Sequence, residues 1–403
     1  MEEKKGSFRW VVLALLFLCI FATCLSMNTI SPLFKEIQRE IPITKTDMGM
    51  IIGITLVASI FLSLIGGGIS DRIGSKWVLG AALIITAIFG ALRSTAGGLY
   101  SLLAFTFLMG GGTALVLPNV SKVVGMWFSP KELGTANGIC MFGLSFSTAV
   151  GMALAAGVLS PAFSGWRNVM VALGVFTLVI GILWLAVFKE KKIDRPGTTK
   201  KQNVIDNFKK VFRVKDIWWL AIFSGLNCIA MYSLVALLPS SFCDRGMSEA
   251  KAGALVGIML GTAAVCKIVG GALSDWMGKR QPFLIITSIV MGVCVFTFPF
   301  FTGIPLIVSL VIAGVALGSI TPILMVIPIE IKEIGPPLAA TAMGLILMVG
   351  NIGGFIGPIV SGKIMDITGA QWPGFLFMGA ALIIEAFCIF PVRETGHGRK
   401  EKN

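Results

Sequence analysis

Charged side chains are scarce in this chain of 403 residues, where Lys, Arg, Asp and Glu together make up 13% and apolar residues 56%. A soluble domain of this length needs far more polar surface, so the composition excludes a soluble globular protein. Only one histidine is present, His397, close to the C-terminus. The eight cysteines show no CxxC or Cys/His spacing, which argues against disulfides and metal ligands and indicates small buried apolar residues.

Motifs for catalysis and cofactor binding are also absent from the sequence. It contains no P-loop, no nucleophile elbow and no metal-ligand spacing. We therefore predict that the protein is not an enzyme and has no catalytic residue, no metal and no cofactor. The formal net charge of +13 does not predict nucleic-acid binding, because the basic residues lie in short segments between apolar runs, next to lipid headgroups.

Long apolar runs are what the sequence has instead. A helix needs about 20 mostly apolar residues to cross a hydrocarbon core of about 30 Å. The sequence therefore predicts an all-α membrane protein of 12 transmembrane helices in a lipid bilayer. The runs lie at residues 10–34, 48–69, 77–95, 98–125, 135–158, 168–188, 216–239, 249–273, 282–302, 304–328, 338–362 and 372–391.

The one sizeable hydrophilic stretch, Lys189–Lys215, contains ten Lys or Arg residues against three acidic residues. It divides the chain into an N-terminal six-helix bundle at 1–188, a cytoplasmic basic linker at 189–215 and a C-terminal six-helix bundle at 216–403. Segments on the side of the linker and both termini carry 23 of the 33 Lys and Arg residues, and loops on the other side carry six. The positive-inside rule then predicts an inner or plasma membrane protein with both termini in the cytoplasm.

An internal repeat relates the two halves. At an offset of 204 residues, GGISDRIGSK at 67–76 aligns with GALSDWMGKR at 271–280, and Pro118 aligns with Pro322. At an offset of 206 residues, TANG at 135–138 aligns with TAMG at 341–344. The halves are therefore expected to be parallel repeats of six helices each.

The repeated G-x-x-x-D-x-x-G-x-[RK] after the second and eighth spans resembles motif A of the major facilitator superfamily, and the similarity covers essentially the whole chain. The resemblance implies two six-helix bundles related by a pseudo-twofold axis along the membrane normal. It also implies a substrate site between the bundles near the midplane, with alternating access by rocking. A monomer is expected because such a fold encloses its own pathway.

Motif A is interpreted as a cytoplasmic gate. The carboxylates of Asp71 and Asp275 are expected to face helix N-termini of the opposite half, a contact that contributes roughly 0.3 to 1 kcal/mol. The alternative is that these charges only set topology and tight turns. The candidate gating residues are Gly67, Asp71, Arg72, Gly74, Lys76, Gly271, Asp275, Gly278, Lys279 and Arg280.

Lys267 places an ammonium group inside the eighth span. An ionisable group at such depth costs roughly 2.5 to 3.5 kcal/mol, so it usually faces a wet cavity or a counter-charge. It stands four residues before Gly271, where the similar monocarboxylate transporters, oxalate:formate antiporters and nitrate/nitrite porters carry an arginine that meets the anion. The resemblance therefore implies that Lys267 meets an anionic substrate, and a lysine that snorkels to the headgroups is the alternative.

Other polar side chains at mid-depth are candidates for the same site, although each would serve equally well as a hydrogen bond between helices. The candidate substrate-binding residues are Lys267, Asn28, Asn119, Ser145, Asn227, Tyr232 and Asn351. A paired basic clamp as in nitrate porters is missing, because the counterpart of Lys267 is Ser63. Lys122 and Arg93 are interpreted as snorkelling cations, and the glycine-rich run at 350–358 as a helix-packing surface.

These features predict a secondary active transporter of a small anion, an organic carboxylate, with or without a coupled proton. A nitrate, nitrite or cyanate porter and an exporter of hydrophobic compounds are the alternatives. A resident proton relay is not expected, because the spans that line the cavity by family analogy carry no mid-membrane Asp or Glu. Glu385 lies in the twelfth span, which the same analogy makes peripheral.

Overall fold

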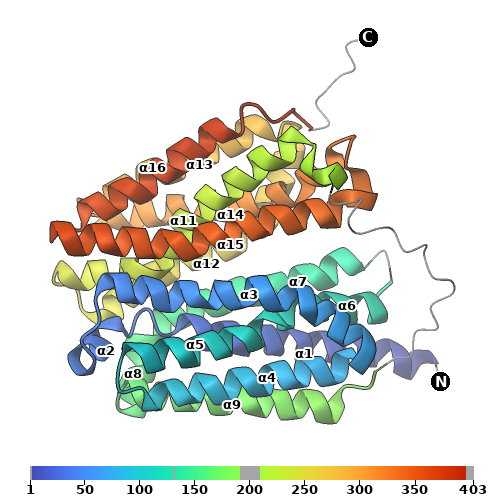
Figure 1. Ribbon diagram of the computed structural model, residues 1–403, viewed down its shortest axis with the longest axis horizontal. Coiled ribbons are helices and arrows are strands. Elements are labelled where there is room, and N and C mark those ends of the chain that lie inside the picture. Colours follow the sequence, from blue (N-terminus) through green and yellow to red (C-terminus); the bar gives the residue numbers. More distant parts are fainter. Residues whose placement is uncertain (1, 130–131, 191–208, 396–403) are drawn as a thin grey trace. The chain divides into compact units, whose positions relative to one another are not determined.

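The computed structural model describes residues 2–129, 132–190 and 209–395, and these fold into helices joined by short loops, with no strand among them (Figure 1). The helices of the first half are α1 (Glu2–Asn28), α2 (Phe34–Glu40), α3 (Lys45–Ile73), α4 (Ser75–Leu92), η1 (Arg93–Thr95), α5 (Leu99–Ala114), α6 (Val116–Trp127), α7 (Leu133–Leu154), η2 (Ala155–Leu159), α8 (Ser160–Phe163) and α9 (Trp166–Val187). Those of the second half are α11 (Lys215–Asp244), α12 (Glu249–Met277), α13 (Gln281–Thr297), α14 (Gly303–Glu330), α15 (Gly335–Thr368) and α16 (Trp372–Cys388).

Each of the twelve predicted runs coincides with a helix or with two consecutive helices. Among the described residues, nine helices are long and apolar enough to cross a membrane. The pair Phe34–Glu40 and Lys45–Ile60 passes together but is bent by 116°, and α13 and α16 are apolar helices of 17 residues each. Hydrocarbon offers no hydrogen bonds to the backbone, so segments of this composition satisfy their peptide groups internally, as helices do.

The chain separates by its contacts into two units, Met1–Ile193 with Leu237–Gly257 and Asp194–Ala236 with Ile258–Asn403. Residues 237–257, the end of α11 and the start of α12, pack within the first unit. Gly253 and Gly257 of α12 make this packing close, because a Cβ added at Gly253 would lie 2.4 Å from the Met152 carbonyl oxygen of α7.

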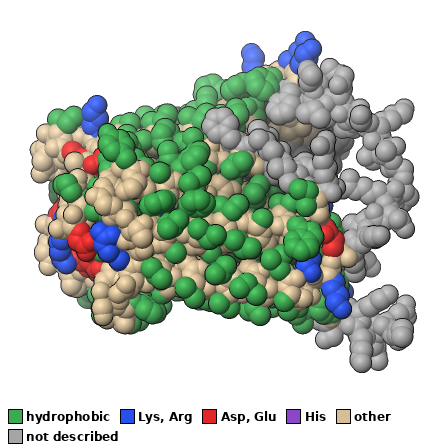
Figure 2. Space-filling view, turned by 60° about the horizontal axis from the view of Figure 1, so that its bottom comes forward, with side chains coloured by type: hydrophobic (Ala, Val, Ile, Leu, Met, Phe, Trp, Pro, Cys, Tyr) green, Lys and Arg blue, Asp and Glu red, His purple; other side chains and the backbone are tan. Residues whose placement is uncertain are grey.

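The first unit is built around a core of aliphatic and aromatic side chains from α1, α4, α6, α7 and α9. Trp184 and Phe188 stack within it with ring centroids 4.1 Å apart. The indole nitrogen of Trp184 donates to the Lys76 carbonyl at 3.0 Å, so the buried ring leaves no unpaired N–H. On the face formed by α4 and α9, hydrophobic side chains cover the surface and charged ones gather at the ends, as a lipid-facing surface requires (Figure 2).

In the second unit, α15 packs on α11 through the glycine-rich run at 350–358. A Cβ added at Gly353 would lie 2.1 Å from the Gly225 carbonyl oxygen, and one at Gly357 would lie 2.6 Å from the Ile229 Cα. The predicted packing role of this run is therefore confirmed, since only glycine lets the two backbones approach so closely.

Replacing Gly353 with Ala is expected to lower the unfolding free energy by about 1 to 3 kcal/mol, because the added methyl group overlaps a backbone that cannot move aside cheaply. Gly344→Ala in the same helix is the matched control, because no atom lies within 4 Å of the Cβ it would add. Thermal unfolding of the detergent-purified variants measures both changes. Equal melting temperatures for the two variants would contradict the close packing.

Candidate functional site

Both copies of motif A end a long helix at a glycine. Gly74 follows α3 with φ +98°, and Gly278 follows α12 with φ +63°, a backbone conformation that favours glycine. A Cβ on Gly74 would also lie 2.3 Å from the Glu190 Oε2 atom, so this carboxylate would have to move aside. The helix after each motif therefore starts from a turn that favours glycine.

The remaining motif residues are distributed as follows. Lys76 is half-buried, Lys279 is exposed and Arg280 is buried. Gly67, Asp71, Arg72, Gly271 and Asp275 lie on α3 and α12, but their side chains fall outside the described part of the structure. The latch proposed for the two aspartates therefore stays a prediction.

Two carboxylates that the sequence does not single out cap the helices after the motifs. Glu190 accepts the backbone N–H of Ser75 at 2.7 Å, at the first turn of α4. Glu394 accepts the backbone N–H groups of Arg280 and Gln281 at 2.7 and 3.1 Å, at the first turn of α13. A carboxylate at this position satisfies N–H groups that a helix leaves unpaired and lies at the positive end of its dipole.

The sequence contains one signal for this pair. Glu190 and Glu394 are 204 residues apart, the same offset that aligns the two copies of motif A. The sequence alone places Glu190 in the basic linker, because composition gives no indication of which acid folds back onto a helix. The two copies of the repeat thus share a capping device as well as a motif.

The cations near motif A are also held by named partners. Arg280 pairs with Glu330 at the end of α14, with an N–O distance of 3.0 Å. Lys122 of α6 donates to the Ser70 carbonyl and hydroxyl oxygens at 2.7 and 3.0 Å. Lys122 was expected to snorkel to the headgroups. It is instead tied to the α3 segment that carries motif A, where the carbonyl and hydroxyl oxygens supply the polar contacts that lipid would not.

Arg93 also departs from its expected snorkelling position, since its side chain is fully buried at the end of α4. Its Nη2 donates to the Ser26 carbonyl oxygen at 2.6 Å and its Nε to the Gly90 carbonyl oxygen at 3.4 Å. Arg93 therefore joins the end of α4 to α1 through backbone oxygens rather than reaching water.

The substrate-binding candidates of the first unit are all at least partly buried. Asn28 donates from Nδ2 to the Cys24 carbonyl at 3.0 Å and to the Thr148 hydroxyl of α7 at 3.2 Å. Asn119 is 1% exposed, and its Nδ2 donates to the Leu115 carbonyl at 2.7 Å. The Asn119 Oδ1 is buried with no hydrogen-bond partner among the described residues. Ser145 is buried in α7.

The candidates of the second unit differ in exposure and partners. Lys267, Tyr232 and Asn351 are half-buried on α12, α11 and α15. Asn227 is buried, and its Nδ2 donates to both carboxyl oxygens of Glu385, at 3.1 and 3.3 Å. The structure thus turns Asn227 toward α16. The assignment of all seven candidates to substrate binding stays a prediction.

Glu385 is the centre of a buried polar cluster that joins three helices. Besides Asn227 of α11, it accepts the hydroxyl of Ser288 of α13 at 2.8 Å, and its side chain is fully buried. These hydrogen-bond partners are uncharged, so hydrogen bonds rather than an ion pair fix its position. Such a cluster stabilises a helix packing only when its members are satisfied together.

Glu385→Gln is expected to keep the melting temperature close to that of the wild type, because an amide of the same shape still accepts from Ser288. Glu385→Leu is expected to cost about 1 to 3 kcal/mol for each partner left buried and unsatisfied. Thermal unfolding in detergent compares the two variants. Equal destabilisation by Gln and Leu would show that the cluster is not held by hydrogen bonding.

Removing the two caps is expected to loosen the first turns of α4 and α13. Glu190→Ala and Glu394→Ala should each lower the unfolding free energy by about 0.5 to 2 kcal/mol, the usual range for a lost N-terminal cap. Lys189→Ala is the control, because it changes the charge of the same segment without touching the capped N–H. Melting temperatures that are the same for Glu190→Ala and Lys189→Ala would refute the capping role.

The long apolar helices indicate a multi-pass membrane protein. The repeated motif A, with a carboxylate cap after each copy, is typical of a transporter. The profile described as "Major Facilitator Superfamily" matches residues 16–331 and, in a second match, residues 226–403. The chain belongs to the Major Facilitator Superfamily. The predicted fold class and family are thereby confirmed.

Curated relatives are similar over nearly the whole chain. The "Probable galactarate/D-glucarate transporter GudP" of Escherichia coli (strain K12) is 26% identical over 95% of this chain and 92% of its own length. The "Hexuronate transporter" of Bacillus subtilis (strain 168) is 24% identical over 94% of this chain and 93% of its own. The "Probable nitrate transporter NarT" of Staphylococcus carnosus (strain TM300) is 25% identical over 94% of both.

Solved structures share the fold. A bacterial homologue of the human lysosomal transporter Spinster, in an inward-facing and unoccupied conformation, matches with a TM-score of 0.78 at 16% identity. The match covers 96% of this chain and 95% of the homologue's chain. The inward-facing, occupied form of such a homologue gives a TM-score of 0.79 at 17% identity. At this identity the likeness concerns the fold alone.

Proposed function

We propose that the protein carries a small organic carboxylate of the sugar-acid class across the cytoplasmic membrane by alternating access. Relatives named for galactarate, D-glucarate and hexuronate transport support this substrate class, and they are similar over more than nine-tenths of the chain. The excess of basic residues on the linker side supports a topology with both termini in the cytoplasm.

The observation that carries the proposal is Lys267. It is half-buried in α12, and between Lys251 and Asp275 it is the one charged residue of the helix sequence. An ammonium so far inside an apolar helix costs roughly 2.5 to 3.5 kcal/mol on insertion scales, an expense that charged groups at such depth usually offset by a functional contact. A substrate carboxylate supplies the opposite charge there.

The hydroxylated carboxylates suit the other candidates as well. A sugar acid presents several hydroxyl groups beside its carboxylate, and amide and hydroxyl side chains such as Asn351 and Tyr232 can both donate to and accept from them. A carrier of such solutes is expected to bind them by several neutral hydrogen bonds and one charge-assisted hydrogen bond. The charge-assisted bond is about twice as strong as a neutral one.

Nitrate transport is the second candidate, because NarT relatives are 25% identical over 94% or more of this chain. Nitrate and a carboxylate are both planar anions, so the lysine at position 267 does not by itself distinguish them. The lack of a basic counterpart at Ser63 favours the carboxylate over nitrate, and the uptake experiment below distinguishes them.

Lys267→Ala is expected to raise the apparent KM for labelled D-glucarate or galacturonate in proteoliposomes by roughly 10- to 100-fold, the effect of one lost charged hydrogen bond. Lys267→Arg is expected to retain part of the uptake because it keeps the charge. Lys251→Ala, in the first turn of the same helix, is the matched control and should leave the KM unchanged.

Competition with unlabelled nitrate decides between the two anions in the same assay. Stronger inhibition by nitrate than by galacturonate at equal concentration would favour the nitrate porter. Wild-type vesicles that take up neither anion would refute the proposed function.

A further inference from the structure

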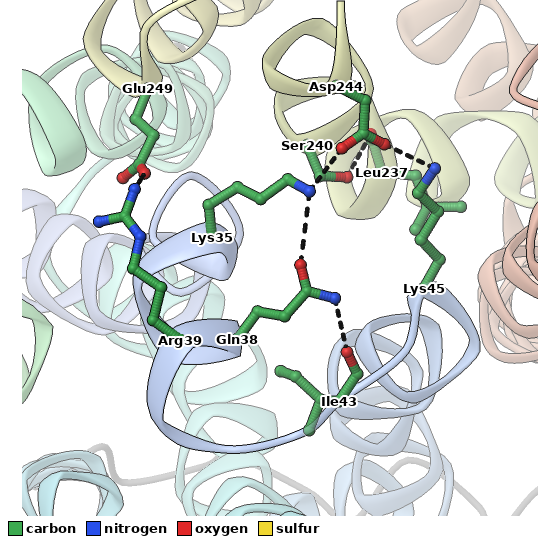
Figure 3. A network of polar contacts seen from close by, with 9 residues as sticks. All are labelled: Lys35, Gln38, Arg39, Ile43, Lys45, Leu237, Ser240, Asp244 and Glu249. Carbon is green, nitrogen blue, oxygen red and sulfur yellow. Dashed lines mark hydrogen bonds and ion pairs between the residues drawn. The ribbon is translucent and has the colours of Figure 1, made fainter.

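The first unit carries a second cluster of charges at the other end of α3 from motif A (Figure 3). Here α2 is set at a sharp bend before α3, and a capping box of Thr44 and Asp47 fixes the start of α3. The last turns of α11 and the first turns of α12 pack against this corner within the same unit. Side chains from α2, α3, α11 and α12 thus meet in one place.

Asp244 at the end of α11 accepts two ammonium groups at once. The Lys35 Nζ lies 2.5 Å from Asp244 Oδ1, and the Lys45 Nζ lies 2.7 Å from Oδ2. The three side chains are between 17% and 26% exposed, so the triplet is in contact with water. One carboxylate therefore serves two cations, which leaves an excess of positive charge around it.

A cavity of about 740 Å³ opens beside this triplet. Its lining includes Lys35, Gln38, Arg39, Cys243, Ser248 and Glu249. Arg39 bonds Glu249 at 2.6 Å but is 71% exposed, and Gln38 accepts from Lys35 at 3.4 Å while donating to the Ile43 carbonyl at 2.8 Å. The volume lies within the usual range for small-molecule sites, roughly 300 to 1,000 Å³.

Three other acidic residues of this corner have partners of their own among the described contacts. Glu36 accepts the Ser160 hydroxyl at 2.8 Å, and Glu40 pairs with Arg167 at 2.7 Å. Asp47 accepts the Thr44 backbone N–H at 2.8 Å. Asp244 is the carboxylate that the described contacts give to the two lysines.

We propose that this cavity is an anion-binding vestibule in which the carboxylate of an incoming sugar acid takes the place of Asp244 on Lys35 and Lys45. The proposal rests on the proposed function for the identity of the anion. Ion pairs that stay in contact with water contribute only roughly 0 to 1 kcal/mol, so a second carboxylate of the same chemistry can displace Asp244 from the two lysines. Asp244 is then a tethered competitor of the substrate.

If the substrate carboxylate replaces Asp244, two sets of variants should shift the KM for the substrate in opposite directions. Asp244→Asn removes the competitor and leaves both ammonium groups, so the external KM for galacturonate should fall. Lys35→Gln with Lys45→Gln removes the anion's partners, so the KM should rise. A cluster that served only to hold the helices together would shift the KM in one direction in both, because each variant breaks the same two ion pairs.

Cys243 provides a second test that needs no substrate, since it is a half-buried free cysteine among the residues that line the cavity. Cys243 is modified by two methanethiosulfonates, one that carries an anionic sulfonate and one that is neutral. The measured quantity is the ratio of the two modification rates, followed by mass spectrometry of the peptide that contains Cys243. Asp244→Asn should raise this ratio by about fivefold, the effect of removing one charge roughly 8 Å away at an effective dielectric constant of about 40. The double lysine variant should lower it.

Lys189→Gln, which removes an exposed charge at the motif A end of the first unit, is the matched control and should leave the ratio unchanged. A ratio that is the same in wild type, Asp244→Asn and the double lysine variant would overturn the anion site. KM values that shift in the same direction in both sets would overturn the exchange. Absence of organic-anion uptake by the wild type, with the ratios as expected, would instead count against the proposed function.

Discussion

Polar groups inside a membrane are stabilised by partners within the protein, and much of the described packing follows from that constraint. Hydrocarbon neither hydrogen-bonds a peptide nor stabilises a charge. The apolar runs therefore become helices, and buried hydroxyls such as Thr86 bond the carbonyl one turn earlier in their own helix, at 2.8 Å for the Ala82 oxygen. The few charges that enter the helices then decide which helices join. Arg93 ties α4 to α1 through the Ser26 carbonyl oxygen, and Glu385 ties α16 to α11 and α13.

The sequence alone predicts the helices and the family because both leave signals that span many residues. Twelve apolar runs and a motif repeated at an offset of 204 survive errors of a few residues at any boundary. The roles of single side chains do not. Lys122 and Arg93 carry the composition of snorkelling residues, yet one bonds Ser70 and the other is buried on backbone oxygens. The partners that a long cationic side chain bonds depend on the helix that packs beside it.

The two capping glutamates and the 237–257 segment are further examples of contacts that the sequence does not predict. Glu190 and Glu394 act by folding back onto helices more than a hundred residues earlier, and periodicity carries no information on such contacts. The contact-based first unit takes in 237–257, which the apolar pattern assigns to the second half, because glycines at 253 and 257 allow α12 to approach α7 closely. Within the first unit, the first copy of motif A and the Glu190 cap lie at one end of α3, and the Asp244 triplet lies at the other.

The two ends also suggest how a small anion is handled in sequence. Lysines held by a replaceable carboxylate would receive the solute from water, and a single half-buried lysine deeper along α12 would meet it inside the membrane. Compact ammonium groups fit this role, since each donates hydrogen bonds to a carboxylate without the fixed planar geometry of an arginine fork. Neutral amide and hydroxyl side chains would then form hydrogen bonds with the hydroxyl groups of the solute.

A structure of the protein with bound galacturonate tests the central claim most directly. The account predicts the substrate carboxylate at a charged hydrogen-bond distance of about 2.7 to 2.9 Å from the Lys267 Nζ atom. A bound galacturonate whose carboxylate is held by other residues, with Lys267 turned to lipid, would contradict it.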